Sequence, residues 1–454
     1  MNDTPRTLKD AAVAAALDGL ASANRNFAAA YPGPRPGRQP VHTVYGGADL
    51  FRADSAAKLG AVARQALNRY APDFLTFAEV VGIPDEQTEL AERVYLRVAD
   101  KLEQEPVEDF RIDFEDGYGH RPDDEEDACA ASAAREVATG LDRGSLPPFI
   151  GIRIKPLTDA LAERAISTLD IFITALLDAT GGELPPGFVV TNPKIVLPEQ
   201  VAVLADLFDQ LEAGLSLPSG TLKMEIMVET PQSIIGPDGR CALLGLVAAG
   251  RGRCIAAHFG VYDYTASVEI TAHHQDLDHP ACDFARHMMQ VALSDTGIWL
   301  SDGATNVLPT RIHRPVSGST LTLQQEHENR LAVHRAWALH FRHVLHSLRH
   351  AYFQGWDLHP AQLPTRYAAL YAFFLQERDA AIERLSQFVG QAARATLTGD
   401  VFDDAATGQA LLNFFLRGVN CGAFDNNDIE RTGLTLAEIE TRSFAHIVAV
   451  RQPS

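Results

Sequence analysis

Eight short runs rich in β-branched and aromatic residues recur through the middle of the chain, which is the feature that most restricts its fold. The runs cover residues 41–47, 110–116, 149–155, 188–196, 222–229, 254–262, 297–303 and 355–359. Helical patterns lie between them, for example at 55–71, 124–141, 161–179 and 198–215. Eight strands with intervening helices is the count of a (β/α)₈ TIM barrel, an α/β fold, so the sequence predicts that fold.

A doubly wound open sheet also alternates strands with helices, but no Gly-rich phosphate loop follows the first run to favour it. We therefore expect the barrel at residues 41–366, after an N-terminal helical segment at 1–40. A further helix at 86–104 is inserted before the second strand. From about residue 364 the pattern becomes mainly helical, so we expect a helical C-terminal region at 367–454.

The charge balance disfavours two classes of function. The chain of 454 residues has 39 Lys plus Arg and 59 Asp plus Glu, a formal net charge of −20. Such a chain repels phosphate backbones and anionic lipid head groups, so we expect neither nucleic-acid nor membrane binding. The five cysteines form no C-x-x-C pair, and no apolar stretch is long enough to span a bilayer. A cytoplasmic location is therefore expected.

Acidic residues stand where two neighbouring strands are expected to end. Glu229 closes the apolar run LKMEIMVE, and Asp263 follows the next run within GVYDYTA. In a barrel, the C-terminal ends of all strands face one cavity, so these carboxylates are expected to meet. Mg²⁺ commonly takes only one or two protein carboxylates, which makes the pair a candidate metal site. Each acid also suits the start of the following helix, or a solvated loop.

Three cationic or titratable side chains complete the candidate site, and each has a plainer alternative. Arg153 suits the binding of a carboxylate or an enolate oxygen, or a buried ion pair with Asp113 or Glu115. Lys194 suits an ion pair with a neighbouring acid. His120 is either a proton-transfer group or an exposed loop residue.

Six motifs occur in an order that resembles a known family. They are FEDGYGHRPDD (114–124), GIRIKP (151–156), NPKIVLPEQV (192–201), IMVETPQSI (226–234), FGVYDYTASV (259–268) and GWDLHPAQL (355–363). They resemble motifs of the HpcH/HpaI aldolase and citrate lyase beta-subunit family. Members of that family are magnesium-dependent (β/α)₈ barrels that make or break carbon–carbon bonds next to a carbonyl.

The resemblance implies roles for the strand-end residues. Glu229 and Asp263 would be the metal ligands, for Mg²⁺ or Mn²⁺, and Arg153 would hold the carboxylate or oxyanion of the substrate. Glu115 and Asp116 would lie beside the metal and hold its waters. These five residues form the core of the expected active site.

Other positions have a supporting role or depart from the family pattern. Lys194 is expected to support substrate binding. Tyr262 stands where citrate-lyase-like members have a second acid. His120 stands two residues before a proline, as the catalytic-base histidine does in the pyruvate aldolases, but Met227 replaces their usual glutamine.

The C-terminal loop GAFDNNDIERTG also departs from the pattern. Acyl-CoA lyases of the family follow G-A-F with a Met-x-Asp that reaches the site of a neighbouring subunit, and this spacing is not kept. Asp425 and Asp428 are the candidate replacements, and a turn built from the Asn/Asp cluster is the alternative.

The resulting expectation is a metal-dependent carbon–carbon lyase or aldolase. Its substrate would be a 2-oxo acid or an acyl-CoA, bound as a small carboxylate, and its reaction would pass through a stabilised enolate. The family resemblance implies a homo-oligomer, a trimer or a hexamer. The alternative is a barrel that binds a metabolite without catalysis, alone or as a subunit of a larger complex.

Overall fold

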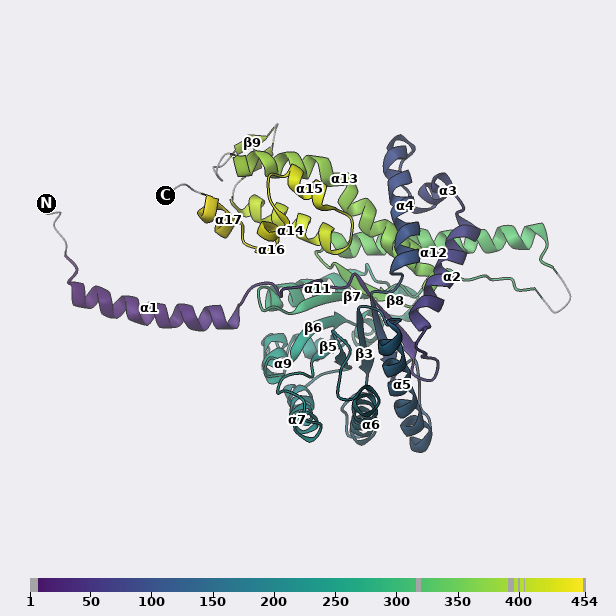
Figure 1. The fold of residues 1–454 in the computed structure, drawn as a ribbon, viewed down its shortest axis with the longest axis horizontal. Coiled ribbons are helices and arrows are strands. Elements are labelled where there is room, and N and C mark those ends of the chain that lie inside the picture. Colours follow the sequence, from purple (N-terminus) through teal and green to yellow (C-terminus); the bar gives the residue numbers. More distant parts are fainter. Residues whose placement is uncertain (1–6, 316–319, 391–395, 399–400, 404, 452–454) are drawn as a thin grey trace.

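Eight parallel strands close into a barrel in sequence order, with β8 paired to β1 (Figure 1). The computed structural model describes residues 7–315, 320–390, 396–398, 401–403 and 405–451. The barrel strands are β1 (His42–Gly47), β2 (Asp109–Asp113), β3 (Phe149–Arg153), β4 (Val189–Asn192), β5 (Met224–Val228), β6 (Cys254–Phe259), β7 (Trp299–Ala304) and β8 (Gln354–Asp357). The predicted TIM barrel is confirmed.

Helices cover the outside of the barrel (Figure 1). Those that follow the strands are α2 (Ser55–Tyr70), α5 (Asp123–Arg143), α6 (Ala162–Thr180), α7 (Pro198–Gly214), α8 (Pro231–Ile234), α9 (Leu243–Ala249), α10 (Val261–Ser267), α11 (Pro280–Leu293), α12 (Leu323–Arg349) and α13 (Leu363–Gly390). Between α2 and β2 lie α3 (Phe74–Val81) and α4 (Thr88–Gln104), and α4 matches the expected inserted helix.

Six strands end earlier than the apolar runs suggested, and the difference is largest after β2, β4 and β6. Local chemistry explains the ends of β2 and β4. After β2, the Asp113 side chain accepts the backbone N–H groups of Glu115 and Gly117, which turns the chain out of the sheet. After β4, Pro193 has no N–H to donate, and Lys194 takes a left-handed conformation with φ 51°. The residues that follow each strand therefore lie in turns at the barrel mouth.

The barrel interior is polar below the mouth. The guanidinium of Arg111 donates to both carboxylate oxygens of Glu225 over 2.6 and 2.8 Å, and it also contacts Asp109. His258 lies 2.8 Å from Glu225, and Thr191 donates to the same carboxylate. All five side chains are buried. Removing one partner of such a buried pair typically costs roughly 3–5 kcal/mol.

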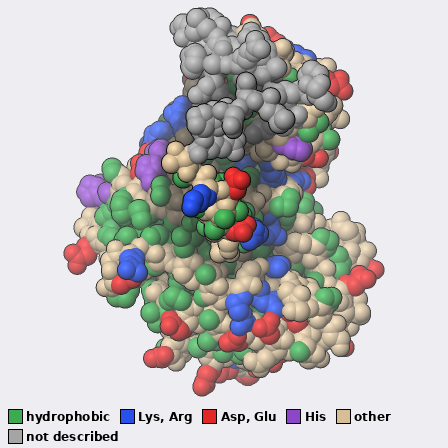
Figure 2. Space-filling view, turned by 90° about the vertical axis from the view of Figure 1, so that its left-hand side faces the viewer, with side chains coloured by type: hydrophobic (Ala, Val, Ile, Leu, Met, Phe, Trp, Pro, Cys, Tyr) green, Lys and Arg blue, Asp and Glu red, His purple; other side chains and the backbone are tan. Residues whose placement is uncertain are grey.

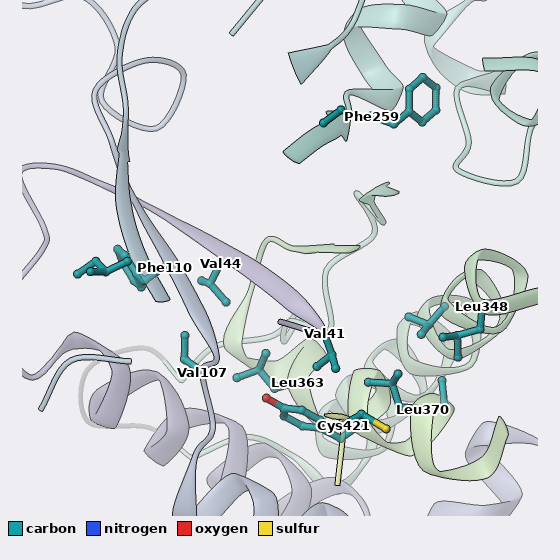
Figure 3. Close-up of a cluster of buried hydrophobic side chains, with 14 of the residues drawn as sticks. Val41, Val44, Val107, Phe110, Phe259, Leu348, Leu363, Leu370 and Cys421 are labelled. Carbon is teal, nitrogen blue, oxygen red and sulfur yellow. The ribbon is translucent and has the colours of Figure 1, made fainter. Parts of the chain in front are cut away.

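The C-terminal helices pack on the barrel through a shared core. They are α14 (Ala405–Asn420), α15 (Asn426–Arg431), α16 (Leu436–Glu440) and α17 (Phe444–Arg451). Two short strands, β9 (Thr396–Thr398) and β10 (Val401–Asp403), pair antiparallel with each other. Figure 3 shows Val41, next to β1, close to Leu363 and Leu370 of α13 and to Cys421. The hydrophobic cluster is continuous across these parts. The expected boundary after residue 366 falls inside α13.

Helix α1 (Asp10–Ala30) extends away from the rest of the protein (Figure 1), and none of its residues is buried. The face shown in Figure 2 has acidic and basic side chains scattered among hydrophobic and uncharged ones. None of the helices in the described part of the chain has the length and apolar character needed to cross a membrane.

Candidate active site

Acidic residues at the end of β2 are held in place by Asp113. Its two carboxylate oxygens accept N–H groups of the following turn, so Glu115 and Asp116 emerge at the barrel mouth. Glu115 is buried, whereas the side chain of Asp116 is 59% exposed. The pair therefore reaches from the protein interior to solvent.

Arg153, the last residue of β3, is held in place by Asp113 and by two aromatic rings. Its Nε and Nη2 donate to the two oxygens of Asp113 over 2.7 and 2.5 Å. Its guanidinium carbon lies 4.8 Å from the ring centre of Tyr45 and 5.5 Å from that of Trp356. These contacts fix the plane of the guanidinium and leave Nη1 facing the mouth, 2.9 Å from Glu115 Oε2. The neighbouring acids raise the pKa of Arg153 despite its burial, so it stays charged.

Lys194, just past β4, joins the two sides of the mouth. Its backbone N–H donates to Oε2 of Glu229 over 2.7 Å. Its Nζ donates to Glu115, lies 3.2 Å from Asp116, and lies 3.9 Å from Asp263. Although desolvation alone would lower the pKa of this ammonium group, the nearby acids raise it overall.

Glu229 follows β5 and is buried against the backbone of the next strand. A Cβ on Gly260, which follows β6, would lie 2.4 Å from Glu229 Cγ and 2.6 Å from its Oε1. Glycine at position 260 therefore makes room for this carboxylate. Burial, together with the negative charge of Asp263, raises the pKa of Glu229 to about 8.

Asp263 lies in the first turn of α10, and its side chain is 44% exposed. Burial raises its pKa, and the charge of Asp116 adds to the effect. The pKa of Glu115 is also raised, first by burial, although Arg153 opposes this. By contrast, Arg153 and Lys194 outweigh the effect of burial on Asp116 and lower its pKa.

The site has more negative than positive charge. Its carboxylates are Asp113, Glu115, Asp116, Glu229 and Asp263, and its cations are Arg153 and Lys194. Oε2 of Glu115 is buried and accepts no hydrogen bond from the described residues, because its ion pair with Arg153 over 2.9 Å lacks hydrogen-bond geometry. Surplus carboxylate oxygens with such an unsatisfied atom are a fitting environment for a hard divalent cation.

Two other groups place three His, Cys, Asp or Glu ligand atoms within 4.8 Å of one another in the described part of the chain. They are Asp283, His346 and His350, and Asp276, Asp278 and His343. Neither group contains a residue expected at the active site. Among the described residues, the carboxylate cluster at the barrel mouth does not form such a three-ligand group. The negative charge of Asp263 nevertheless acts on Glu229, and Mg²⁺ can take as few as one or two protein carboxylates.

Among the described residues, no hydrogen bond or ion pair joins His120 to the carboxylate cluster. The residue is exposed, on the loop between β2 and α5, and within the described residues it has neither a hydrogen bond nor an ion pair. Met227 is buried beneath the site, with its sulfur 4.0 Å from Nη1 of Arg153. Tyr262 uses its hydroxyl to bond the backbone of Ala304 and Asn306, which holds the segment after β7.

The C-terminal aspartates form a helix cap. Asp425 accepts the N–H of Asp428 at the start of α15, and the Asp428 side chain accepts the N–H of Asp425 in return. Asp428 is also buried near Arg378 and Arg431. These contacts match the turn-forming alternative for the cluster.

Sequence reasoning did not identify three residues that shape the site. Tyr45 and Trp356 flank Arg153, and Gly260 leaves room for the Glu229 side chain. The ion pairs of Arg153 with Asp113 and Glu115 match the alternative that the sequence offered for this arginine. The alternating inward positions of β1 and β8 were the available signal for the two aromatic residues. A glycine directly after β6 was the signal for the close approach of another side chain.

Several solved structures are similar to this chain. A citrate lyase from Burkholderia xenovorans LB400 matches with a TM-score of 0.55 and 16% identity, over 88% of this chain and 98% of that one. The CitE protein of Mycobacterium tuberculosis, in complex with magnesium, acetoacetate and coenzyme A, matches with a TM-score of 0.47 and 14% identity, over 84% and 99%. A lead(II) complex of Haloferax volcanii malate synthase matches with a TM-score of 0.44 and 13% identity, over 91% and 97%.

At these identities the likeness concerns the fold, and the citrate lyase shares the barrel described above. No curated protein sequence matches the chain. A family model does match, over residues 20–447, and it is described as a domain of unknown function, DUF6986. Since the match covers most of the chain, the protein belongs to the DUF6986 family.

Proposed function

We propose that this protein is a Mg²⁺- or Mn²⁺-dependent carbon–carbon lyase or aldolase. One observation carries the proposal: the ends of β2 to β6 bring acids, an arginine and a lysine into one cluster at the barrel mouth. In TIM barrels this end of the strands is where catalytic residues gather. The shared fold of the Burkholderia xenovorans citrate lyase agrees with this reaction class.

Glu229 and Asp263 would hold the metal ion. The surplus of carboxylates and the unsatisfied oxygen of Glu115 support this assignment. Glu115 and Asp116 would accept hydrogen bonds from the waters around the ion. A bound divalent cation supplies positive charge at the point where negative charge develops on an enolate oxygen.

Arg153 would bind the carboxylate of the substrate. Because Asp113 already occupies its Nε and Nη2, only Nη1 is directed to the mouth, and it binds at a fixed position. A donor held in this way needs no reorganisation when charge develops during the reaction. Lys194 would add a second positive charge on the other side of the cluster.

The substrate class proposed is a 2-oxo acid or an acyl-CoA with a carboxylate that Arg153 can bind. The leaving or accepting fragment would be an aldehyde in the first case and a thioester in the second. We also propose that the protein acts as a homo-oligomer, a trimer or a hexamer, as the family resemblance implies.

A metabolite-binding barrel without catalysis is the second candidate, and the position of Lys194 favours it. The ammonium group contacts Glu115, Asp116 and Asp263, so it already compensates part of their charge. A carboxylate ligand would then be bound by Lys194 and Arg153 without a metal ion.

Proton exchange separates these functions. Pyruvate is incubated with the protein and Mg²⁺ in D₂O, and the methyl signal is followed by NMR. Enolisation predicts loss of that signal, which chelation by EDTA should prevent. A panel that also includes acetyl-CoA and short-chain acyl-CoA thioesters tests the second substrate class. If the protein binds a member of the panel, but none of the compounds exchanges its protons for deuterium with or without metal, the non-catalytic barrel is favoured.

A further inference from the structure

A cavity of about 240 Å³ lies at the end of the barrel opposite the carboxylate cluster. Its lining includes Gln39 just before β1, Trp299 at the start of β7, and Ala351 just before β8. These positions are all at the N-terminal ends of strands. The segment that leads from α1 into the barrel runs past α11 (Figure 1). Its Pro34 and Arg35 form one side of the cavity, and the N–H of Gly33 donates to the backbone oxygen of Asp295, just after α11.

Three arginines from distant parts of the sequence line this cavity. Arg35 comes from the segment between α1 and β1, Arg417 from α14, and Arg442 from the segment between α16 and α17. Arg417 donates to the Gln39 side chain over 2.6 Å. Arg442 donates to backbone oxygens of the α1–β1 segment, including that of Gly37 over 3.0 Å. Thus these two arginines are bound by neutral groups.

The Arg35 guanidinium has a different environment. Its central carbon lies 5.3 Å from the ring centre of Trp299, so it rests on an aromatic face at the cavity wall. Within the described residues no hydrogen bond or ion pair engages it. Its donors are therefore available to a bound molecule.

Charge compensation distinguishes these three half-buried arginines from the buried arginines of the barrel. The arginines in the barrel that each contact at least one carboxylate are Arg111, Arg153, Arg253, Arg286 and Arg366. Within the described chain, no ion pair to a carboxylate involves Arg35, Arg417 or Arg442. Asp295 also lines the cavity, but its side chain is exposed and makes no ion pair with them among the residues described.

The positive charges at this end of the barrel also affect one another. Burial lowers the pKa of Arg417 to about 10, and the charge of Arg442 adds to the effect. Lys223, just before β5, has a pKa lowered by burial and by the charge of Arg35. At Arg442, the charge of Glu440 opposes the lowering of the pKa by burial. The cavity lining itself has three arginines and one acid, Asp295, which is a local surplus of positive charge. A bound anion would relieve it.

We propose that the cavity between Arg35, Arg417 and Arg442 is a binding site for a compact multivalent oxyanion of the phosphate or polycarboxylate class. Guanidinium groups present paired donors that match the oxygens of such anions. The volume is below the range of about 300–1,000 Å³ typical of drug-sized ligands, so a small anion fits better than a nucleotide cofactor. The site is separate from the proposed catalytic cluster because it lies at the other ends of the strands.

Calorimetric titration of the full chain with inorganic phosphate, pyrophosphate and citrate tests this site. Ionic strength is held constant with NaCl, and EDTA removes divalent metals. We expect one anion per chain, and Arg35→Gln should weaken its binding by about tenfold or more, because one charge-assisted interaction is lost. Arg35 is the preferred position because, among the residues that the structure describes, its side chain makes no hydrogen bond whose loss would disturb the fold.

Arg251→Gln is the matched control, since this exposed arginine pairs with Asp206 and Asp209 elsewhere on the surface. It should leave anion affinity unchanged. Comparison of phosphate and pyrophosphate with citrate shows whether the site prefers a phosphate or a carboxylate. The proposal is supported if either kind of anion binds and if Arg35→Gln weakens that binding. Absence of binding by all three anions at millimolar concentration, or equal affinity in Arg35→Gln and the unmodified protein, would overturn the proposal.

Discussion

The backbone N–H of Lys194 donates a hydrogen bond to Oε2 of Glu229 over 2.7 Å, so the turn after β4 positions a carboxylate at the end of β5. Lys194 adopts a left-handed conformation with φ 51°, which costs a residue with a side chain roughly 1–2 kcal/mol. Its side chain meanwhile contacts Glu115 at the end of β2. One residue thus links three strand ends of the proposed active site.

Gly260→Ala should disable the proposed metal site without unfolding the protein. Gly260 has φ −94°, which alanine tolerates, but the new Cβ would lie 2.4 Å from Cγ of Glu229. The carboxylate must therefore move. We expect Mg²⁺ affinity to fall at least about tenfold, as for a misplaced ligand, while circular dichroism remains native.

Gly245→Ala is the matched control for that substitution. Gly245 lies within α9, and a Cβ there meets no other atom within 4 Å. Alanine in a helix interior is favoured over glycine by roughly 0.5–1 kcal/mol, so this variant should be equally or more stable and bind Mg²⁺ normally. Unchanged Mg²⁺ binding in Gly260→Ala would contradict the placement of Glu229.

Two substitutions of Arg153 should separate stability from activity. Arg153→Met leaves Asp113 buried without a cation and should lower the free energy of unfolding by roughly 3–5 kcal/mol. Arg153→Lys keeps the positive charge. Its single nitrogen cannot bond both oxygens of Asp113 and also donate to a substrate at the barrel mouth. We expect it to fold and to lose about 10²-fold or more in turnover. Urea denaturation and steady-state assays measure the two effects, and near-normal turnover in Arg153→Lys would contradict the substrate-binding role.

The stability of the protein should depend on pH through Glu212. Burial alone would raise the pKa of this carboxyl, but Arg253 and the N–H groups of Leu222 and Gly220 lower it from 4.5 to about 2. Because the folded-state pKa is the lower one, the stabilisation is fully present above pH 4.5 and is lost as the pH falls toward 2. The free energy of unfolding of Glu212→Gln should thus fall furthest below that of the unmodified protein near neutral pH.

Urea denaturation across a range of acidic and neutral pH values checks this expectation. The difference in the free energy of unfolding between the two proteins should narrow on acidification. If the difference in the free energy of unfolding stayed constant from about pH 6 to about pH 3, the ion pair between Glu212 and Arg253 would not contribute to the pH dependence of stability.

The sequence predicted the barrel because eight apolar runs and the helices between them are local patterns that the fold preserves. It also placed candidate residues at strand ends, which the closure of the barrel brings to one mouth. It could not predict the pair between Arg111 and Glu225, since 114 positions separate them and no periodicity marks them. The sequence did offer an ion pair of Arg153 with Asp113 or Glu115 as an alternative. The two hydrogen bonds to Asp113 follow from the register between β2 and β3, which places these two residues side by side.

His120→Gln tests the one expected catalytic residue that has no hydrogen bond or ion pair with the cluster in the described residues. The side chain is exposed and has no hydrogen bond or ion pair in the described part of the chain. We expect turnover within a few-fold of the unmodified protein, because proton transfer requires hydrogen-bond reach of the substrate. A loss of about 10²-fold or more would instead show that the loop brings His120 into the site during catalysis.

The most direct test of the proposed function is calorimetric titration of Mg²⁺ into metal-stripped protein, Glu229→Gln, and the exposed control Glu199→Gln. The unmodified protein and Glu199→Gln should each bind one ion per chain with similar affinity. Glu229→Gln should bind at least roughly 10- to 100-fold more weakly, because a ligand carboxylate is lost. Retention of full Mg²⁺ affinity by Glu229→Gln, with a native fold, would contradict the metal assignment on which the proposed reaction depends.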